Sequence, residues 1–547
     1  MNNFEMRLHN SLTKIFQHYA PPARPEKTWL FALRGERVAF QLSYNGMGNS
    51  GWLKLLTTAP KGITLTARRV NHVPANIPAT WETDDGYIST EPGLYPDLLT
   101  PLDQDRLRFS PGTWQTIWLE AEISPQCTAG ANNISITLEG PDGQAVGHAQ
   151  VTIDVAAAVL PPLVIPHTRW FHTDCLAQYY GVEVFSDSYW QIIENFAAYA
   201  VRHGINMLLT PIFTSPLDTE IGGERLTVQL VDVTANGDKY SFGFDKLTRW
   251  VEMCKRVGVE FYEISHLFTQ WGAKHAPKIV DTNGTRLFGW DTDATGPEYA
   301  NFLQQMLPAL TAKLRELCIA EKCYFHISDE PNITSLEQYK AARKIVEPYL
   351  QGFKIMDALT NYDFFKQGVV SVPIPSVDHI QPFLEGDVPE LWTYYCCAQS
   401  CKVPNLFMMQ PGFRHRILGA LLYKFDIAGF LQWGYNFYNC MHSVYPVNPF
   451  VITDADGTFP SGDAFIVYPG EGGLPWGSTR LSVANEAFSD LRALRKLEEL
   501  AGREFVLAIL DENLASPLTF DEFPQTDEYI LQLRKRINAE ISKRGAF

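Results

Sequence analysis

The chain has 547 residues, 46% of them hydrophobic and 13% aromatic, which is enough for two or three domains with a large core. The formal net charge of −16 and the lack of a basic stripe argue against a nucleic-acid partner, because such binding relies on clustered Lys and Arg. No apolar run reaches the length of about 18 residues that spans a bilayer, and the first residues lack the apolar core of a signal peptide, so we predict a cytoplasmic protein without a membrane partner.

Residues 1–160 have the pattern of an antiparallel β-sandwich domain. From about residue 28 to residue 155, short alternating runs are separated by Gly, Pro and Asn, and clear examples are 37–43, 113–119 and 133–138. The stretch 156–166 contains three prolines and no regular period. We interpret it as the linker to the next domain.

Residues 161–500 have the pattern of an α/β domain, in which apolar runs alternate with longer amphipathic segments. Eight predicted strands favour a closed (β/α)8 barrel of the TIM type. We expect the strands at 168–174, 205–212, 259–266, 323–328, 354–359, 377–381, 391–397 and 429–435, and helices that include 189–203, 244–257, 299–318 and 415–425. Residues 501–547 are charged and helical, and we predict a tail packed on the barrel.

Two adjacent carboxylates, Asp329 and Glu330, follow the apolar run 323–327. Catalytic groups of such barrels lie at the carboxyl ends of the strands. Neighbouring carboxylates at the end of a buried strand repel each other unless solvent, a cation or a substrate offsets the cost. Helix capping is the structural alternative, but the following helix has a capping box of its own in Thr334 and Glu337. We therefore interpret the pair as catalytic.

The adjacency of the pair points to one kind of sugar chemistry. Most glycosidases place two carboxyl groups on different strands, about 5 to 5.5 Å apart when retaining and about 6.5 to 9.5 Å apart when inverting. Sequence neighbours suit the substrate-assisted variant, in which the sugar's own 2-acetamido oxygen attacks the anomeric carbon. We assign Glu330 as general acid/base and Asp329 as the carboxylate that orients the acetamide, because these roles need pKa values pushed apart.

Further residues at the predicted strand ends are suited to holding a sugar, since its C–H faces pack on aromatic rings and its hydroxyls need polar partners. Core packing is the alternative for the tryptophans, and a hydrogen-bonded rim position is the alternative for His266. Glu263 lies three residues before His266, so we expect it to pair inside the barrel wall. The candidate substrate-binding residues are His172, Asp174, His266, Trp392, Tyr394, Trp433, Tyr435 and Asn436.

Four segments in this order resemble glycoside hydrolase family 123: 328–331 (SDEP), 392–397 (WTYYCC), 428–436 (AGFLQWGYN) and 462–470 (GDAFIVYPG). The resemblance covers roughly residues 168–500 and implies a (β/α) barrel, usually with an N-terminal β-sandwich. It also implies an exo-acting, retaining, substrate-assisted β-N-acetylgalactosaminidase, with the acid pair carried onto Asp329 and Glu330. Tyr394 is then expected near the acetamide and Trp433 at the floor of the −1 subsite.

Two segments, 435–443 and 485–490, depart from the family pattern, so the specificity stays open. The alternatives are a β-N-acetylglucosaminidase or an endo-acting β-N-acetylhexosaminidase on the same fold, and a non-catalytic carbohydrate-binding protein. The expected partner is a glycan or oligosaccharide that contains N-acetylhexosamine, and a homo-oligomer is left open. We predict no cofactor and no metal site. The nine cysteines lack paired C-x-x-C spacing, and strand alternation places His172 and Asp174 together but His167 a strand length away.

Overall fold

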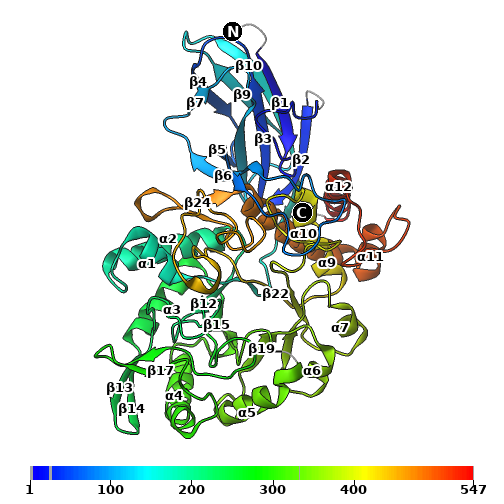
Figure 1. The fold of residues 1–547 in the computed structure, drawn as a ribbon. Helices are drawn as coiled ribbons and strands as arrows, with labels where there is room; N and C mark the ends of the chain where they lie inside the picture. The colour runs from blue at the N-terminus through cyan, green and yellow to red at the C-terminus, as the bar shows by residue number, and fades with distance from the viewer. Residues whose placement is uncertain (1–3, 24–26, 332, 546–547) are drawn as a thin grey trace.

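The computed structural model describes residues 4–23, 27–331 and 333–545. A β-sandwich formed mainly by the N-terminal part stands on an α/β barrel, and the C-terminal helices lie where the two meet (Figure 1). The predicted combination of an N-terminal antiparallel sandwich and an α/β domain is therefore confirmed.

The sandwich consists of two sheets, in which all neighbouring strands are antiparallel except β2 and β10, which run parallel. Alternate residues face inward and bury a core between the sheets that includes Phe40, Leu42, Ile134 and Ile136. In spatial order the first sheet contains β1 (Glu5–Asn10), β3 (Arg37–Asn45), β8 (Gln115–Ile123), β5 (Ile63–Ala75), β6 (Gly93–Pro101), β24 (Pro475–Ser478) and β23 (Tyr468–Pro469). The second sheet contains β2 (Lys27–Arg34), β10 (Ala145–Val159), β9 (Gly130–Glu139), β4 (Gly51–Thr58) and β7 (Arg106–Phe109).

Two strands of the first sheet come from the far end of the chain. β24 pairs with β6, with Gly477 opposite Leu99 and Ser478 opposite Leu98, and β23 pairs with β24. The sandwich therefore extends beyond the predicted N-terminal domain and is completed by residues that follow the barrel.

The barrel has eight parallel strands, as the sequence predicts. They are β11 (His167–Arg169), β12 (Met207–Thr210), β15 (Phe261–Ile264), β18 (Cys323–Phe325), β19 (Lys354–Ala358), β20 (Val372–Ile374), β21 (Trp392–Tyr394) and β22 (Gly429–Gln432). β22 pairs with both β21 and β11, and a parallel bridge between Ser376 and Tyr394 joins the two edges of the sheet. The backbone N–H of Val377 donates to the Tyr394 carbonyl at 2.9 Å and completes the ring.

The predicted position of the sixth strand is wrong. The strand lies at Val372–Ile374 instead of 377–381, and the latter segment leads into α7 (Gln381–Glu385). Pro373 removes one backbone N–H from the strand, which is normally a signal against a central strand. It is tolerated here because β20 forms a full ladder only with β19 and meets β21 only through one bridge. The first strand is also shorter than predicted, since helix α1 begins at Thr173.

Helices cover the barrel at the predicted places, with one exception. The predicted helix 415–425 is divided into α8 (Gly412–Arg416) and α9 (Leu418–Lys424). The N-cap of α5 is Ser335, where the sequence predicts Thr334. The other helices are α1 (Thr173–Tyr180), α2 (Asp187–Arg202), α3 (Asp245–Val257), α4 (Pro297–Glu316), α5 (Leu336–Val346), α6 (Tyr362–Lys366), α10 (Thr479–Ala501), α11 (Arg503–Leu510) and α12 (Asp527–Arg544). Two short hairpins are formed by β13 (Asp232–Asn236) with β14 (Lys239–Gly243), and by β16 (Ile279–Val280) with β17 (Arg286–Phe288).

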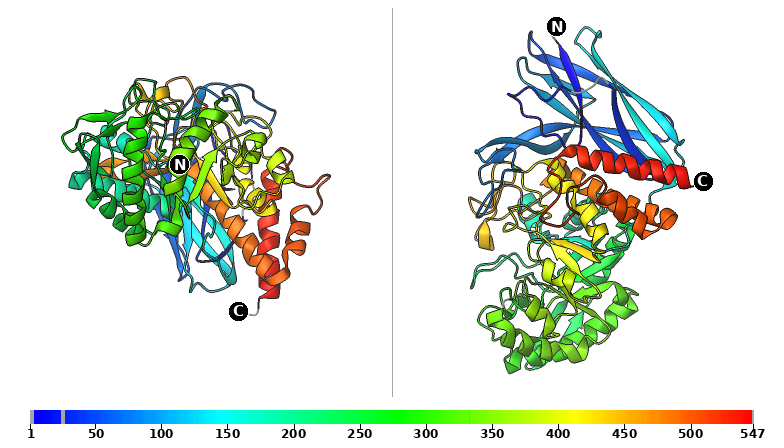
Figure 2. Two further views of the ribbon diagram at one scale, coloured as in Figure 1. Left: turned by 90° about the horizontal axis from the view of Figure 1, so that it is seen from below. Right: turned by 90° about the vertical axis from the view of Figure 1, so that its right-hand side faces the viewer.

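The last helix, α12, lies between the sandwich and the barrel side of the molecule, against α10, β2 and β10 (Figure 2). Arg534 on this helix pairs with Asp490 of α10 at 2.9 Å and with Glu36, which precedes β3. Arg416 of α8 reaches the same Asp490 at 2.7 Å and Glu486 at 2.9 Å. We call these five residues the junction network. Nearly all of it is buried, so each charge needs the opposite charge beside it.

None of the described helices is both long enough and apolar enough to cross a bilayer. The nine cysteines are free thiols and form no disulfide.

Candidate active site

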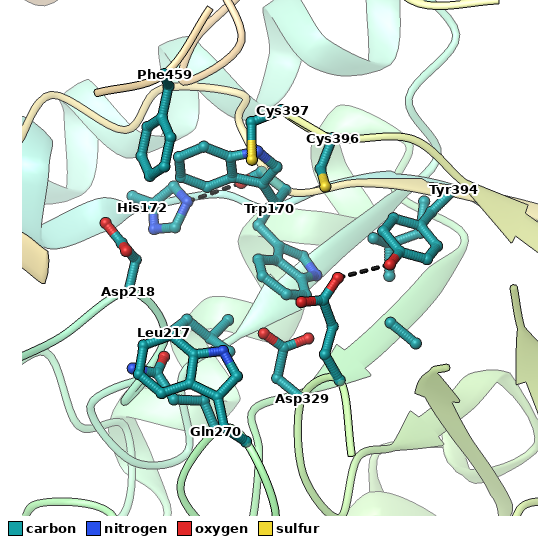
Figure 3. Close-up of a pocket in the computed structure, with 15 residues that line it drawn as sticks. Trp170, His172, Leu217, Asp218, Gln270, Asp329, Tyr394, Cys396, Cys397 and Phe459 are labelled. Carbon is teal, nitrogen blue, oxygen red and sulfur yellow. Dashed lines mark hydrogen bonds between the residues drawn. The ribbon is translucent and has the colours of Figure 1, made fainter. Parts of the chain in front are cut away.

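A pocket opens at the carboxyl ends of the barrel strands, where catalytic groups of such barrels lie. Figure 3 shows the side chains that line it. Five residues predicted from the sequence meet there: His172, Asp329, Glu330, Tyr394 and Trp433. They come from the ends of four different strands, so the closed ring of the barrel brings them together.

The acid pair is held in place by the loop that follows β15. The backbone N–H of Trp271 donates to the carbonyl of Asp329 at 2.8 Å, and the Ser328 hydroxyl donates to the carbonyl of Thr269 at 2.8 Å. Glu330 has a φ of 42°, in the left-handed region that residues other than glycine rarely adopt. Backbone strain of this kind concentrates at functional sites. Both carboxylates line the pocket, so they are placed for chemistry on a ligand.

Both carboxyl groups of the pair titrate above their ordinary range. Burial in the surrounding protein holds the pKa of Asp329 well above its usual value, and the charge of Glu330 raises it further. Burial also raises the pKa of Glu330, although the Tyr394 hydroxyl, which donates to Glu330 Oε1 at 2.5 Å, opposes this effect. Two carboxyl groups in one site titrate as a pair and share a proton. The pair can therefore supply one acid and one carboxylate together.

A buried cation lies next to the pair in the barrel interior. His326 is hydrogen-bonded through Nε2 to Glu263 at 2.7 Å and through Nδ1 to Asp357 at 2.9 Å. Burial alone would lower its pKa, but these hydrogen bonds raise the pKa of His326 to about 10, so the ring is protonated. Its positive charge favours the ionised form of Asp329. Glu263 also accepts from the indole of Trp170 at 2.7 Å, which fixes one wall of the pocket.

His266, His326 and Asp357 have ligand atoms within 4.8 Å of one another, and they form the one cluster with metal-site spacing in the described part of the chain. A ring protonated on both nitrogens has no lone pair for a metal, and His326 is such a ring. His266 stacks face to face on it, with ring centroids 4.1 Å apart. Predicted to bind substrate, His266 is instead buried behind the pocket and does not line it.

His172 lines the pocket, but both of its ring nitrogens are engaged. Nε2 lies 2.9 Å from the carbonyl of Trp433 and Nδ1 lies 3.1 Å from the guanidinium of Arg225. Because burial and the charge of Arg225 lower the pKa of His172 to about 3, the ring is neutral, donates from Nε2 and accepts at Nδ1. Asp174 binds the same arginine through both oxygens at 2.8 Å. The Asn436 side chain forms two hydrogen bonds of 2.9 Å with the backbone of His172. Neither Asn436 nor Asp174 lines the pocket.

Trp433 lines the pocket and is fixed in orientation. Its indole N–H donates to Asp463 Oδ2 at 2.9 Å, and its ring meets the rings of Phe437 and Phe459 edge-on. Burial raises the pKa of Asp463 to about 7, against the hydrogen bond from Trp433. A fixed aromatic face beside the acid pair is suited to the apolar face of a sugar ring.

Two other candidates lie away from the pocket. The hydroxyl of Tyr435 donates to the carbonyl of Phe196 in α2 at 3.0 Å, and the residue is fully buried. Trp392 is fully buried in the barrel interior and packs directly over Gly429, where a Cβ atom would come within 2.2 Å of the indole ring. The core-packing alternative therefore applies to Trp392.

The remaining pocket residues were not selected from the sequence. Trp170 lies inside the predicted strand 168–174, and in the structure it directly follows β11. Most of the others lie on long loops after β12, β15 and β22, which carry no motif. They are Leu217, Asp218, Gln270, Trp271, Ala358, Cys396, Cys397, Leu431 and Phe459.

The model of the catalytic domain of glycoside hydrolase 123 matches residues 170–497. The fold is similar to that of a family 123 glycoside hydrolase from Clostridium perfringens, with a TM-score of 0.74 and 14% identity over 99% of this chain and 98% of that chain. An endo-β-1,4-mannanase from Thermotoga petrophila is much less similar, with a TM-score of 0.33 and 12% identity over 61% of this chain and 77% of that chain. No curated protein matches.

Proposed function

The chain belongs to glycoside hydrolase family 123, and we propose that it releases terminal β-linked N-acetylgalactosamine from glycans by a retaining, substrate-assisted mechanism. The observation that carries this proposal is the arrangement of Asp329 and Glu330. They are consecutive, both line one pocket at the barrel mouth, and both have raised pKa values. Consecutive residues are poorly placed to bracket a glycosidic bond, but they suit a reaction in which the substrate brings its own nucleophile.

In the first step, Glu330 protonates the glycosidic oxygen as the acetamide oxygen attacks the anomeric carbon and the leaving group departs. Asp329 accepts a hydrogen bond from the acetamide N–H and stabilises the positive charge of the oxazolinium ion. In the second step, water attacks the same carbon while Glu330 takes its proton, which opens the oxazolinium ring. Two inversions give a product with the β configuration of the substrate.

These roles require a defined protonation state for each carboxyl group. Glu330 must hold the shared proton at the start, and Asp329 must be ionised. The positive charge of His326 favours ionised Asp329, and the substrate N–H adds a hydrogen bond to that form. Tyr394 keeps the carboxyl of Glu330 at a fixed place, and Trp433 offers its face to the sugar.

The identity of the natural glycan is also part of the proposal. The Clostridium perfringens enzyme hydrolyses glycolipid glycans, so glycans of this kind are a class to test. A β-N-acetylglucosaminidase or an endo-acting β-N-acetylhexosaminidase would use the same acid pair. A binding protein without activity is the remaining alternative, and the raised pKa values of the pair support an enzyme instead.

The test is hydrolysis of aryl β-N-acetylgalactosaminide and its glucosaminide epimer by the wild type, Glu330→Gln and Asp329→Asn. We expect faster turnover of the galactosaminide, a large loss in Asp329→Asn, and a smaller loss in Glu330→Gln, because an aryl leaving group departs with little help from an acid. Proton NMR of the first-formed sugar should show the β anomer. A first-formed α anomer would show an inverting enzyme and disprove substrate assistance. Binding of N-acetylhexosamine without turnover would support the carbohydrate-binding alternative.

A further inference from the structure

One carboxylate of the pocket has no part in the proposed reaction. Asp218 lines the pocket on the loop that follows β12. Its Oδ2 accepts from the backbone N–H of His442 at 3.0 Å, and its carbonyl accepts from the Ser443 hydroxyl at 2.7 Å. Its φ of 42° is again in the left-handed region. Two loops thus hold this side chain in a strained and fixed position.

The second carboxylate oxygen, Oδ1, receives no hydrogen bond from the residues that the structure describes. A carboxylate can accept about four hydrogen bonds, so Asp218 keeps unused acceptor capacity. Gln270, another pocket residue, is in the same condition. Its amide nitrogen donates to the carbonyl of Thr219, next to Asp218, at 3.1 Å, while its buried Oε1 has no partner among the described residues. Buried acceptors are costly to leave unpaired, and each calls for an explanation.

These two residues form one wall of the pocket, which we call the acceptor wall. In Figure 3 Asp218 and Tyr394 lie at opposite sides of the pocket, with Asp329 between them. His172 lies near Asp218 in the same view, but its ring nitrogens are both engaged. The acceptor wall therefore supplies the unused hydrogen-bonding capacity on this side.

The chemistry of the substrate matches this wall. With the anomeric carbon at Asp329 and Glu330, the C4 carbon lies across the six-membered ring and its hydroxyl is directed away from the acid pair. A hydroxyl is a hydrogen-bond donor, and the wall offers acceptors only. The C4 hydroxyl is axial in galacto sugars and equatorial in gluco sugars, so an acceptor at a fixed place distinguishes the two.

We propose that Asp218, supported by Gln270, accepts a hydrogen bond from the C4 hydroxyl of the terminal sugar and selects the galacto configuration. This inference rests on the proposed function, since it places the anomeric carbon at the acid pair. It makes Asp218 a specificity-determining residue of the same site.

The experiment combines substrate and protein changes in a cycle. Wild type, Asp218→Asn and Asp218→Ala are assayed on aryl β-N-acetylgalactosaminide and on its 3-deoxy, 4-deoxy and 6-deoxy analogues. A charged hydrogen bond predicts that the wild type loses about 10- to 150-fold in kcat/KM on removal of the C4 hydroxyl. Asp218→Ala should lose a similar factor on the parent sugar, and little more on the 4-deoxy analogue. Glu220→Gln, an exposed position two residues along the loop, is the matched control and should behave as wild type.

The outcomes separate this inference from the proposed function. If the losses in kcat/KM from Asp218→Ala and from removal of the C4 hydroxyl multiply in full, the two groups are not in contact and the inference is overturned. It is also overturned if Asp218→Ala is coupled to the 3-deoxy or 6-deoxy analogue and not to the 4-deoxy analogue. If Asp218→Ala fails to fold, Asp218→Asn and the wild-type deoxy series decide the question. If the wild type cleaves no aryl N-acetylhexosaminide, the proposed function fails and this inference fails with it. Turnover by the wild type without coupling at C4 overturns this inference alone.

Discussion

The pocket and the junction network both enclose carboxylates, but they surround them differently. In the junction network Asp490 lies between Arg416 and Arg534; burial alone would raise its pKa, yet the two cations lower it below the usual value. In the pocket Asp329 has another carboxylate as its neighbour, and its pKa is raised. The first arrangement stabilises a fixed charge and the second keeps a proton available. Burial raises the pKa of Asp329 and the neighbouring Glu330 adds to this effect, whereas the two cations beside Asp490 outweigh burial.

The largest effect should come from removing the proposed proton donor, Glu330. Glu330→Gln keeps the shape of the side chain but cannot protonate a leaving group, so we expect kcat on an unactivated oligosaccharide to fall by about 10² to 10⁴-fold. On a nitrophenyl glycoside the loss should be smaller, because nitrophenolate departs with little help. Urea unfolding should stay close to that of wild type. An equal loss on both substrates would argue against the acid role.

Removing a charge from the junction network should lower the stability of the protein and leave its activity unchanged. Arg534→Met leaves Glu36 without its buried cation and Asp490 with Arg416 alone, and we expect the free energy of unfolding to fall by about 3 to 5 kcal/mol. The kcat of the folded enzyme should not change. Arg536→Met is the control on the same helix. Arg536 is half exposed and its partner Glu540 keeps an ion pair with Arg544, so we expect a loss of about 1 kcal/mol or less. A large loss of kcat in Arg534→Met would remove the distinction between the two regions.

The positive charge of His326 should affect how activity depends on pH. Its replacement in His326→Gln removes a positive charge that favours ionised Asp329, so the pKa of Asp329 should rise further. Because the proposed mechanism requires ionised Asp329, the acidic limb of the pH profile of kcat/KM should move to higher pH, by about one unit. His148→Gln, an exposed position in the sandwich, should leave the profile in place. A shift to lower pH would contradict the electrostatic role.

The same residue should also affect stability as a function of pH. The pKa of His326 is raised from 6.5 to about 10 in the folded protein. Its stabilising contribution is therefore complete below pH 6.5 and is lost as the pH rises toward 10. We expect the difference in unfolding free energy between wild type and His326→Gln to shrink over this range in urea titrations. A constant difference would mean that the ring is neutral in the folded state.

The smallest effect is expected at Trp433, the aromatic face proposed to pack on the sugar ring. Trp433→Phe keeps an aromatic face but loses the hydrogen bond to Asp463, which is worth about 0.5 to 1.5 kcal/mol. The KM should rise by no more than about tenfold, with kcat nearly unchanged. Trp29→Phe, at a half-exposed position on β2 of the sandwich, serves as control. A loss in kcat as large as that of Glu330→Gln would place Trp433 in the reaction itself.

The sequence predicted the eight-stranded barrel and the acid pair because both leave local signals. Apolar runs alternate with amphipathic segments, and two carboxylates stand together at the end of a strand. It misplaced the sixth strand, since Pro373 weakens a strand signal that tertiary pairing overrides. The sequence places Tyr435 with Trp433 at the end of a predicted strand. In the structure β22 ends at Gln432, so the alternation of side chains between two faces does not extend to Tyr435.

Other features could not be predicted from local patterns. Asp218 and Gln270 lie in loops and meet only because the barrel closes, so neither has a motif. His172 and Asp174 are indeed neighbours in space, but they share Arg225 from a distant loop, which leaves neither free for a sugar hydroxyl. The pairing of β24 with β6 joins segments from opposite ends of the chain, and no local period reveals it.

That last pairing has a consequence for how the protein is made. A ribosome releases β6 early and β24 only after the entire barrel, so the edge of β6 has no partner during most of synthesis. An open sheet edge invites pairing with other chains. The sandwich can therefore complete its sheet only near the end of translation, and a truncated chain that stops before Pro475 would expose a ready site for aggregation.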